Sequence, residues 1–265
     1  MSRVHSFLAE LYRRNPLLAL LGWLHVVLFL ATIFGLLTDD RQVLGINTWV
    51  KSMKFMLSLV IYLWTVAWLS GYINRPRWAI RSVSIVIAIV IVIESACFLL
   101  QAARGTTSHF NFTTDFDAAI FQTMGVMIGI NMLMAVIILS MFANPSVKLS
   151  APYLWGIRSG LLLFLVGGAI GGVMIGNNAH TFGAPDGGPG LPILNWSTVA
   201  GDLRIAHGLA LHGLQILPLF GFALGRWSAI SSDAARLALL GTGVFGYSWF
   251  VYRLFRQAVE GMPFF

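Results

Sequence analysis

The chain has 265 residues, of which 57% are hydrophobic and 10% are charged. Soluble domains contain about 25% charged residues, so this composition excludes an ordinary soluble globular protein and indicates a protein embedded in lipid. The formal net charge of +7 comes from basic residues scattered between apolar segments, a pattern typical of topology signals and not of nucleic-acid binding. The single cysteine, Cys97, excludes a disulfide framework or a multi-cysteine metal site.

Apolar segments long enough to cross a bilayer as helices follow one another along the whole chain, since a span needs about 20 residues. They cover residues 16–37, 50–72, 82–103, 118–142, 153–176, 203–225 and 234–256. The segment before them, MSRVHSFLAELYRRNP, is short, basic and amphipathic, unlike a cleavable signal peptide. We therefore predict an all-α integral membrane protein, a seven-transmembrane-helix bundle forming one polytopic membrane domain over residues 1–265.

The distribution of Lys and Arg between the loops predicts the orientation. Basic residues are more frequent in the segments that an inward N-terminus places in the cytoplasm, and most acidic residues fall on the other side. With seven spans, we expect a cytoplasmic N-terminus and an outer C-terminus, in the inner membrane of a bacterium. The longest loop, 177–202, is then outside. Because it contains Leu191, Ile193 and Trp196, we expect an ordered lid over the helix ends.

Polar residues gather towards the predicted outer side of the second and third spans. Lys51 and Lys54 lie three residues apart where the second span begins, and the loop after the third span contains His109. The third span contains Glu94 near its middle, followed on the same side by Gln101 and then by Arg104. A carboxylate at this depth is protonated or paired and marks a functional site by default. Its expected structural partners are Arg104, Arg204, His207 and His212.

The sixth span, read inward from the outer side, contains a second polar group. Arg204 and Gln215 project in nearly the same direction, with His207 and His212 on either side of that direction. In the first span, His25 lies at a depth similar to that of His212. Together these residues predict an intramembrane cavity that contains histidines and opens to the outer side.

The chemistry of this cavity points to cofactor and ligand residues. The candidate cofactor ligands are His25, His109, His207 and His212, with haem b as the candidate cofactor. The candidate anion-binding or ligand-binding residues are Lys51, Lys54, Glu94, Gln101, Arg104, Arg204 and Gln215. His207, His212 and Glu94 are candidate metal ligands, although His207 and His212 are five residues apart and do not form a chelating i,i+4 pair. The glycines of VGGAIGGVMIG in the fifth span, Gly168, Gly172 and Gly176, predict close helix packing or a flat ligand on exposed backbone.

Three functions remain open from the sequence. Histidines on different helices with cations nearby favour a haem-binding or metal-binding redox protein. The same polar residues without a cofactor favour a transporter, channel or receptor-like binder of a small anionic or protonatable ligand. A membrane enzyme that uses histidine and glutamate as acid and base on a lipid or quinone is the third. Membrane lipids are the expected partners, with a quinone or another small molecule as ligand.

Overall fold

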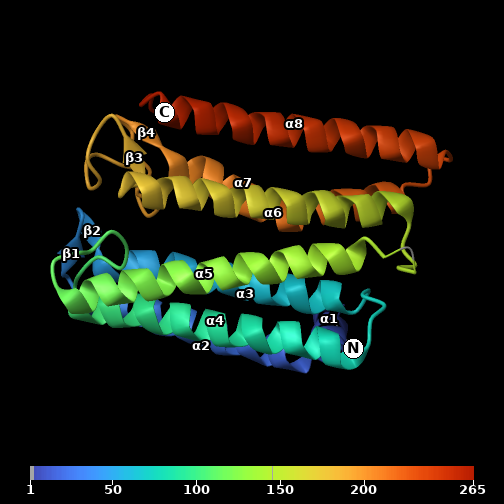
Figure 1. Ribbon diagram of the computed structural model, residues 1–265, viewed down its shortest axis with the longest axis horizontal. Coiled ribbons are helices and arrows are strands. Elements are labelled where there is room, and N and C mark those ends of the chain that lie inside the picture. The colour runs from blue at the N-terminus through green and yellow to red at the C-terminus, as the bar shows by residue number, and fades with distance from the viewer. Residues whose placement is uncertain (1–2, 145) are drawn as a thin grey trace. The chain divides into compact units, whose positions relative to one another are not determined.

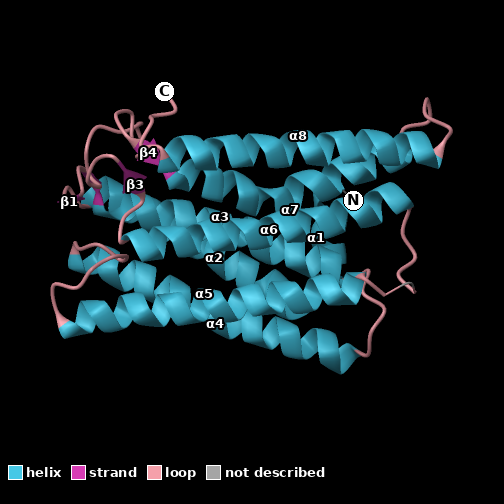
Figure 2. Ribbon diagram, turned by 45° about the horizontal axis from the view of Figure 1, so that its top comes forward, coloured by secondary structure: helices cyan, strands magenta, loops and turns pink. Residues whose placement is uncertain are grey.

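The computed structural model describes residues 3–144 and 146–265. Among these residues the chain forms eight helices and four very short strands. Contacts between Cα atoms divide it into a first unit, Met1–Met134, and a second unit, Ala135–Phe265. Figures 1 and 2 show that helices make up nearly all of each unit, with the strands confined to the loops at helix ends.

The first unit contains α1 (Arg3–Arg14), α2 (Pro16–Thr38), α3 (Thr48–Ser70), α4 (Arg77–Arg104) and most of α5 (Asp115–Phe142). Strands β1 (Gln42–Val43) and β2 (Ile46–Asn47) form an antiparallel hairpin between α2 and α3. Its turn residues, Leu44 and Gly45, both have positive φ, as a two-residue type I′ turn requires. The amphipathic α1 lies outside the apolar segments, and Arg13 and Arg14 lower the pKa of Glu10 within it to about 2.

The second unit contains the end of α5, α6 (Ala151–Asn177), α7 (Leu203–Arg226) and α8 (Asp233–Val259). Helices α6 and α7 have the most extensive contact in this unit, and buried residues such as Ile157, Leu161 and Leu214 lie along them. Strands β3 (Thr181–Phe182) and β4 (Gly201–Asp202) pair antiparallel at the two ends of the long loop. The loop is therefore ordered, as predicted, but by strand pairing and not by its apolar residues, since Ile193 is 60% exposed.

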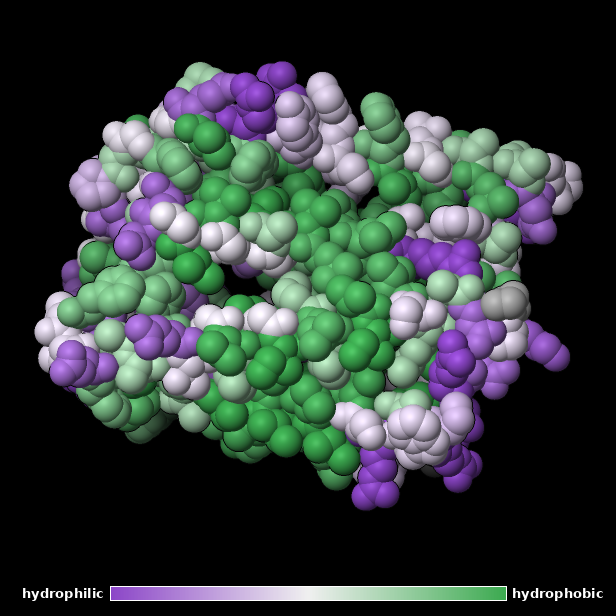
Figure 3. All heavy atoms as spheres, viewed as in Figure 1, coloured by the Kyte–Doolittle hydropathy of each residue, from purple (hydrophilic) through white to green (hydrophobic). Residues whose placement is uncertain are grey.

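Six helices, α2 to α7, are long and apolar enough to cross a membrane. They begin and end within a few residues of the first six predicted spans. Along α2, large apolar side chains such as Val27 and Phe34 are more than half exposed, as expected where helices meet lipid and not water. On the face in Figure 3, hydrophobic side chains cover the middle of the helices and hydrophilic ones gather mainly at their ends. The fold is that of a polytopic helical membrane protein.

The predicted count of seven spans is not supported. The segment 234–256 forms α8, but α8 is not among the helices apolar enough to cross a membrane. The physical reason is its composition. Three arginines, Arg236, Arg253 and Arg256, and several small and hydroxyl-bearing residues lower the hydropathy of α8. The predicted placement of the two termini on opposite sides depended on that seventh span and loses its support with it.

Candidate functional site

Glu94 lies in the middle of α4 and is the most unusual polar residue of the first unit. Only 7% of it is exposed, and its neighbours along the buried side of α4 are Ile87, Val90, Ile91 and Phe98. Its Oε1 atom has no hydrogen-bond partner among the described residues. Buried polar atoms in native proteins nearly always have a partner, so this oxygen requires an explanation.

The arginines predicted as partners of Glu94 bind other carboxylates. Arg104, at the end of α4, forms an ion pair with Asp117 in the first turn of α5. Gln101 Nε2 donates to the same Asp117 oxygen over 2.8 Å, and Thr114 Oγ1 donates to the other oxygen over 2.7 Å. The predicted Gln101 and Arg104 therefore lie together, but around Asp117. The ion pair expected between Glu94 and Arg104 is therefore not formed, and Arg204, in the second unit, pairs with Asp202.

His25 is completely buried in α2 and holds α2 against α4. Its Nδ1 lies 2.8 Å from the carbonyl oxygen of Leu21, and its Nε2 lies 2.8 Å from Ser95 Oγ. Ser95 Oγ in turn donates to the Ile91 carbonyl oxygen over 2.7 Å. Both ring nitrogens thus contact protein atoms, and ligation of a metal by His25 would require one of these contacts to break.

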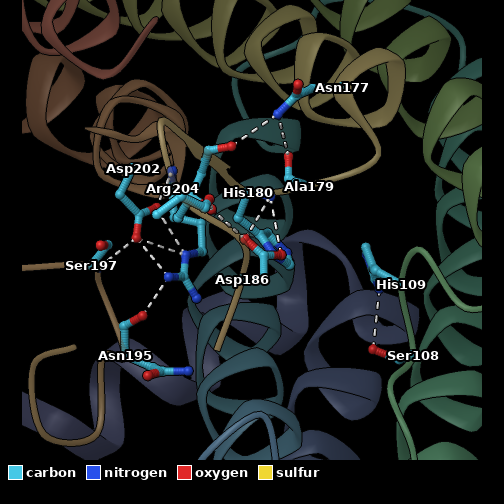
Figure 4. Close-up of polar contacts among 12 residues, drawn as sticks. Ser108, His109, Asn177, Ala179, His180, Asp186, Asn195, Ser197, Asp202 and Arg204 are labelled. Atoms are coloured by element: carbon cyan, nitrogen blue, oxygen red, sulfur yellow. Dashed lines mark hydrogen bonds and ion pairs between the residues drawn. The ribbon is translucent and has the colours of Figure 1, made fainter. Parts of the chain in front are cut away.

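His109 lies in an aromatic cluster, which we define as Phe55, Phe98, His109, Phe110 and Phe121. Its ring stacks on that of Phe98 with 5.5 Å between the ring centroids. The ring centroids of Phe98 and of Phe55 on α3 are 3.9 Å apart. Ser108 Oγ is 3.1 Å from His109 Nδ1, and Figure 4 marks this contact by a dashed line. Phe98 follows Glu94 by four residues on α4, so the aromatic cluster lies one helical turn beyond Glu94.

Lys51 and Lys54 are half-buried in the first two turns of α3. The same stretch of α3 is fastened to α4 by hydroxyl groups, because Thr48 Oγ1 donates to the Ala102 carbonyl over 3.0 Å and Ser52 Oγ to that of Phe98 over 3.1 Å. The backbone at the two lysines is therefore held close to the C-terminal end of α4, where Gln101 and Arg104 lie.

The histidines of α7 have different surroundings. His207 Nδ1 lies 2.8 Å from the Gly167 carbonyl oxygen on α6, so Nδ1 is the donor and Nε2 remains able to accept a hydrogen bond or ligate a metal. A Cβ atom at Gly171 would lie 3.2 Å from His207 Cε1, which shows how closely α6 encloses the ring. His212 Nδ1 is 3.3 Å from Gln215 Oε1 one turn later on the same helix.

The glycines at the contact between α6 and α7 are mostly not the predicted ones. Cβ atoms at Gly156, Gly160 and Gly167 would lie 2.5 to 2.9 Å from α7 backbone atoms. Cβ atoms at Gly172 and Gly176 would meet none of the described atoms within 4 Å. Close packing through glycine is thus present, but its stripe lies on another side of the helix.

Two carboxylates order the long loop of the second unit (Figure 4). Asp202 accepts from the Ser197 backbone N–H over 2.8 Å and pairs with Arg204, which also donates to the Asn195 carbonyl oxygen. Asp186 Oδ2 lies 2.5 Å from His180 Nδ1, and Asp186 also accepts from Thr181 Oγ1. Although burial opposes the effect, the hydrogen bonds from His180 and Thr181 hold the pKa of Asp186 well below its usual range.

The predicted site residues therefore fall into separate groups. Glu94, Gln101, Arg104 and His109 belong to the first unit, and Arg204, His207, His212 and Gln215 belong to the second, each described within its own unit. No group of three or more His, Cys, Asp or Glu side chains that could hold a metal ion occurs in residues 3–144 and 146–265.

Sequence reasoning missed the residues around which these groups are built, Asp117, Ser95, Asp186 and Asp202. Asp202 carried a readable signal, because an aspartate directly before a helix is a preferred N-cap, and its side chain accepts from the Arg204 N–H. Asp117 carried another, because Thr114 and Asp117 have the spacing of a capping box, and the Asp117 N–H donates to Thr114 Oγ1. Ser95 contacts His25, which is 70 residues away in the sequence. Asp186 contacts His180 within an irregular loop. No local sequence pattern predicts such contacts. Compared with known proteins, the chain matches no family model, no curated protein and no solved structure.

Proposed function

We propose that this protein is a membrane-embedded binder or transporter of a small protonatable ligand, and that Glu94 is the residue that takes up the proton or positive group. The observation that carries this proposal is the buried Glu94 carboxyl group, 7% exposed, with an oxygen that has no hydrogen-bond partner among the described residues. An ionisable residue within a membrane-spanning helix marks a functional site by default.

Glu94 places a polar group in an apolar interior, where a polar group without compensation is costly. A carboxylate without a partner in an apolar interior costs several kcal/mol, so the group is stable when neutral or when a cation lies beside it. A purely structural role would pair it with a basic residue. Arg104, on the same helix, instead pairs with Asp117, which leaves Glu94 available for a proton or for a ligand.

Labelling with dicyclohexylcarbodiimide tests this proposal, because this apolar reagent couples to protonated carboxyl groups that water does not reach. In the purified protein, mass spectrometry of peptides should find the adduct on Glu94. Glu10 is the matched control, since it forms ion pairs with Arg13 and Arg14 and should stay unlabelled. The variant Glu94→Gln should lose the adduct. Absence of labelling at Glu94 throughout pH 5 to 8 would contradict the proposal.

A haem or metal redox protein is the second candidate, and the geometry of His207 favours it. Metal-ligating histidines usually donate their other ring N–H to a carbonyl or carboxylate, and His207 Nδ1 has this contact with the Gly167 carbonyl oxygen. The purified protein would then show a Soret band in its visible spectrum, and His207→Ala would remove it. A protein without a Soret band would contradict the haem proposal, and the binder or transporter would be the remaining candidate.

We further propose that the end of the first unit that contains α1 and the loop between α3 and α4 faces the cytoplasm. That end carries Arg13, Arg14, Arg75, Arg77 and Arg81 with only Glu10 as an acid between residues 3 and 38, whereas its other end holds Asp39, Asp40, Asp115 and Asp117 beside its basic residues. The positive-inside rule supports this assignment, in the bacterial inner membrane that we expected. In intact cells of a Cys97→Ser background, an impermeant thiol reagent should label Asp115→Cys, and Asn74→Cys only after permeabilisation. The reverse pattern would invert the orientation.

A further inference from the structure

A groove in the second unit runs between α6 and α8. Its volume is about 450 Å³, within the range of about 300–1,000 Å³ typical of small-molecule sites. Its lining is almost entirely apolar and includes Leu162, Val166 and Val173 on α6 with Val244, Val251 and Phe255 on α8. Val166 is 46% exposed, so the groove is open on the outside of the chain.

A second hollow of about 410 Å³ lies at the C-terminal end of α8. Its lining combines the charged and polar side chains of Arg253, Arg256, Gln257 and Glu260 with the apolar Trp249, Met262 and Pro263. Tyr252 lines both this hollow and the apolar groove. Tyr252 therefore lies between the two spaces, which are neighbours along α8, and we call the hollow with the arginines the mouth of the groove.

The mouth carries a net positive charge. Arg256 pairs with Glu260 over 2.6 Å, and Arg253 forms no ion pair among residues 3–144 and 146–265, so one positive charge remains. Trp249 lies 5.5 Å from Tyr252, and such aromatic side chains are enriched where a membrane meets water. In Figure 3, hydrophilic residues gather over the C-terminal part of α8, uppermost in the view, beside hydrophobic surface.

We propose that this composite site binds an anionic phospholipid, with an acyl chain in the groove between α6 and α8 and the phosphate at Arg253 and Arg256. The ligand should be apolar over most of its length and negatively charged at one end, because the groove is lined mainly by apolar side chains and the mouth carries two guanidinium groups against the one carboxylate of Glu260. Arginine is well suited to phosphate recognition. A zwitterionic lipid would bring its own cation to the same mouth and bind less tightly.

Native mass spectrometry of the purified protein tests the proposal, with phosphatidylglycerol and phosphatidylcholine of identical acyl chains as probes. The wild type should bind phosphatidylglycerol more tightly. The double variant Arg253→Gln, Arg256→Gln should lose at least about fivefold in phosphatidylglycerol affinity, since one arginine near the surface contributes roughly that factor, and should keep its phosphatidylcholine affinity. Val166→Trp should weaken binding of both lipids, because the larger side chain fills the groove.

Arg81→Gln is the matched control, since Arg81 is exposed on α4 in the other unit, and it should leave both affinities unchanged. Equal binding of the two lipids by the wild type would overturn the proposal. So would a double variant that keeps the preference for phosphatidylglycerol, or a control that loses it to the same extent.

Discussion

The contact between α6 and α7 in the second unit differs from the polar contacts that join the helices of the first unit. In the first unit, polar side chains fasten one helix to another: Asn15 Nδ2 donates to Ser84 Oγ over 2.7 Å, and Tyr62 Oη donates to Asn131 Oδ1 over 2.8 Å. In the second unit, glycine allows close approach of the α6 and α7 backbones, and a Cβ atom at Gly156 would lie 2.5 Å from the Leu217 carbonyl oxygen.

This difference shows two solutions to one problem. Lipid tails are as apolar as leucine side chains, so the hydrophobic effect does not drive helices together within a bilayer. Hydrogen bonds and close van der Waals contact remain, and the polar contacts of the first unit and the α6–α7 contact of the second are one example of each. A bundle held by buried polar groups can also accommodate one more polar group, and this is the unit in which Glu94 lies.

The largest expected effect is on the glycine contact. Gly160→Leu should lower the free energy of unfolding by about 3 kcal/mol, because its Cβ atom would lie 2.8 Å from the Gly213 carbonyl oxygen and 3.0 Å from Pro218 Cδ. Gly172→Leu is the matched control on the same helix and should be neutral or slightly stabilising, since leucine is the better helix former. Thermal unfolding in detergent measures both. Equal losses would mean that α6 and α7 do not pack through Gly160.

The next effect concerns the ion pair between α4 and α5. Arg104→Ala leaves Asp117, whose side chain is 3% exposed, without its charge partner. We expect a loss of roughly 2 kcal/mol, less than for a fully buried pair because about a third of the Arg104 side chain is exposed. Arg13→Ala removes an arginine that is 75% exposed and should change thermal stability little. If both variants lose the same stability, the ion pair between Arg104 and Asp117 does not hold α4 and α5 together.

The loop of the second unit should depend on pH. Asp186→Asn should cost about 1.5 kcal/mol at pH 7, the value of a charge-assisted hydrogen bond. Because the pKa of Asp186 is lowered in the folded protein, its contribution is complete above the ordinary value of about 4 and is lost as the pH falls below it. The difference in melting temperature between wild type and variant should therefore shrink from pH 5 to pH 3. The exposed Asp40→Asn should show no such difference, and a constant gap for Asp186→Asn would contradict the assignment.

The smallest effect is expected at His25. Ser95→Ala removes the partner of His25 Nε2, and hydrogen bonds between membrane helices contribute about 0.6 kcal/mol on average. Ser140→Ala, which removes an exposed hydroxyl bonded to its own helix, provides the baseline in the same unfolding assay. A loss above 2 kcal/mol would show that His25 does more than join α2 to α4.

The sequence predicted the first six spans well, because hydropathy and proline positions determine where an apolar helix can cross lipid. It failed at α8, where length and apolar residues suggested a span and the arginines reduced the hydropathy. It predicted a helix that contains Glu94, Gln101 and Arg104 but could not identify Asp117 as the partner of Arg104. That carboxylate reaches Arg104 only because the loop 105–114 returns the chain to the end of α4, and no periodicity within a helix encodes such a return.

The central claim is that Glu94 is a buried carboxyl group that takes up a proton or a cation. Infrared difference spectroscopy between acidic and alkaline buffer tests it directly, because the C=O stretch of a protonated carboxyl group shielded from water is distinct from that of a hydrated one. We expect such a band in the wild type and in Glu10→Gln, and its loss in Glu94→Gln. A wild-type spectrum without this band, or a band that persists in Glu94→Gln, would contradict the account.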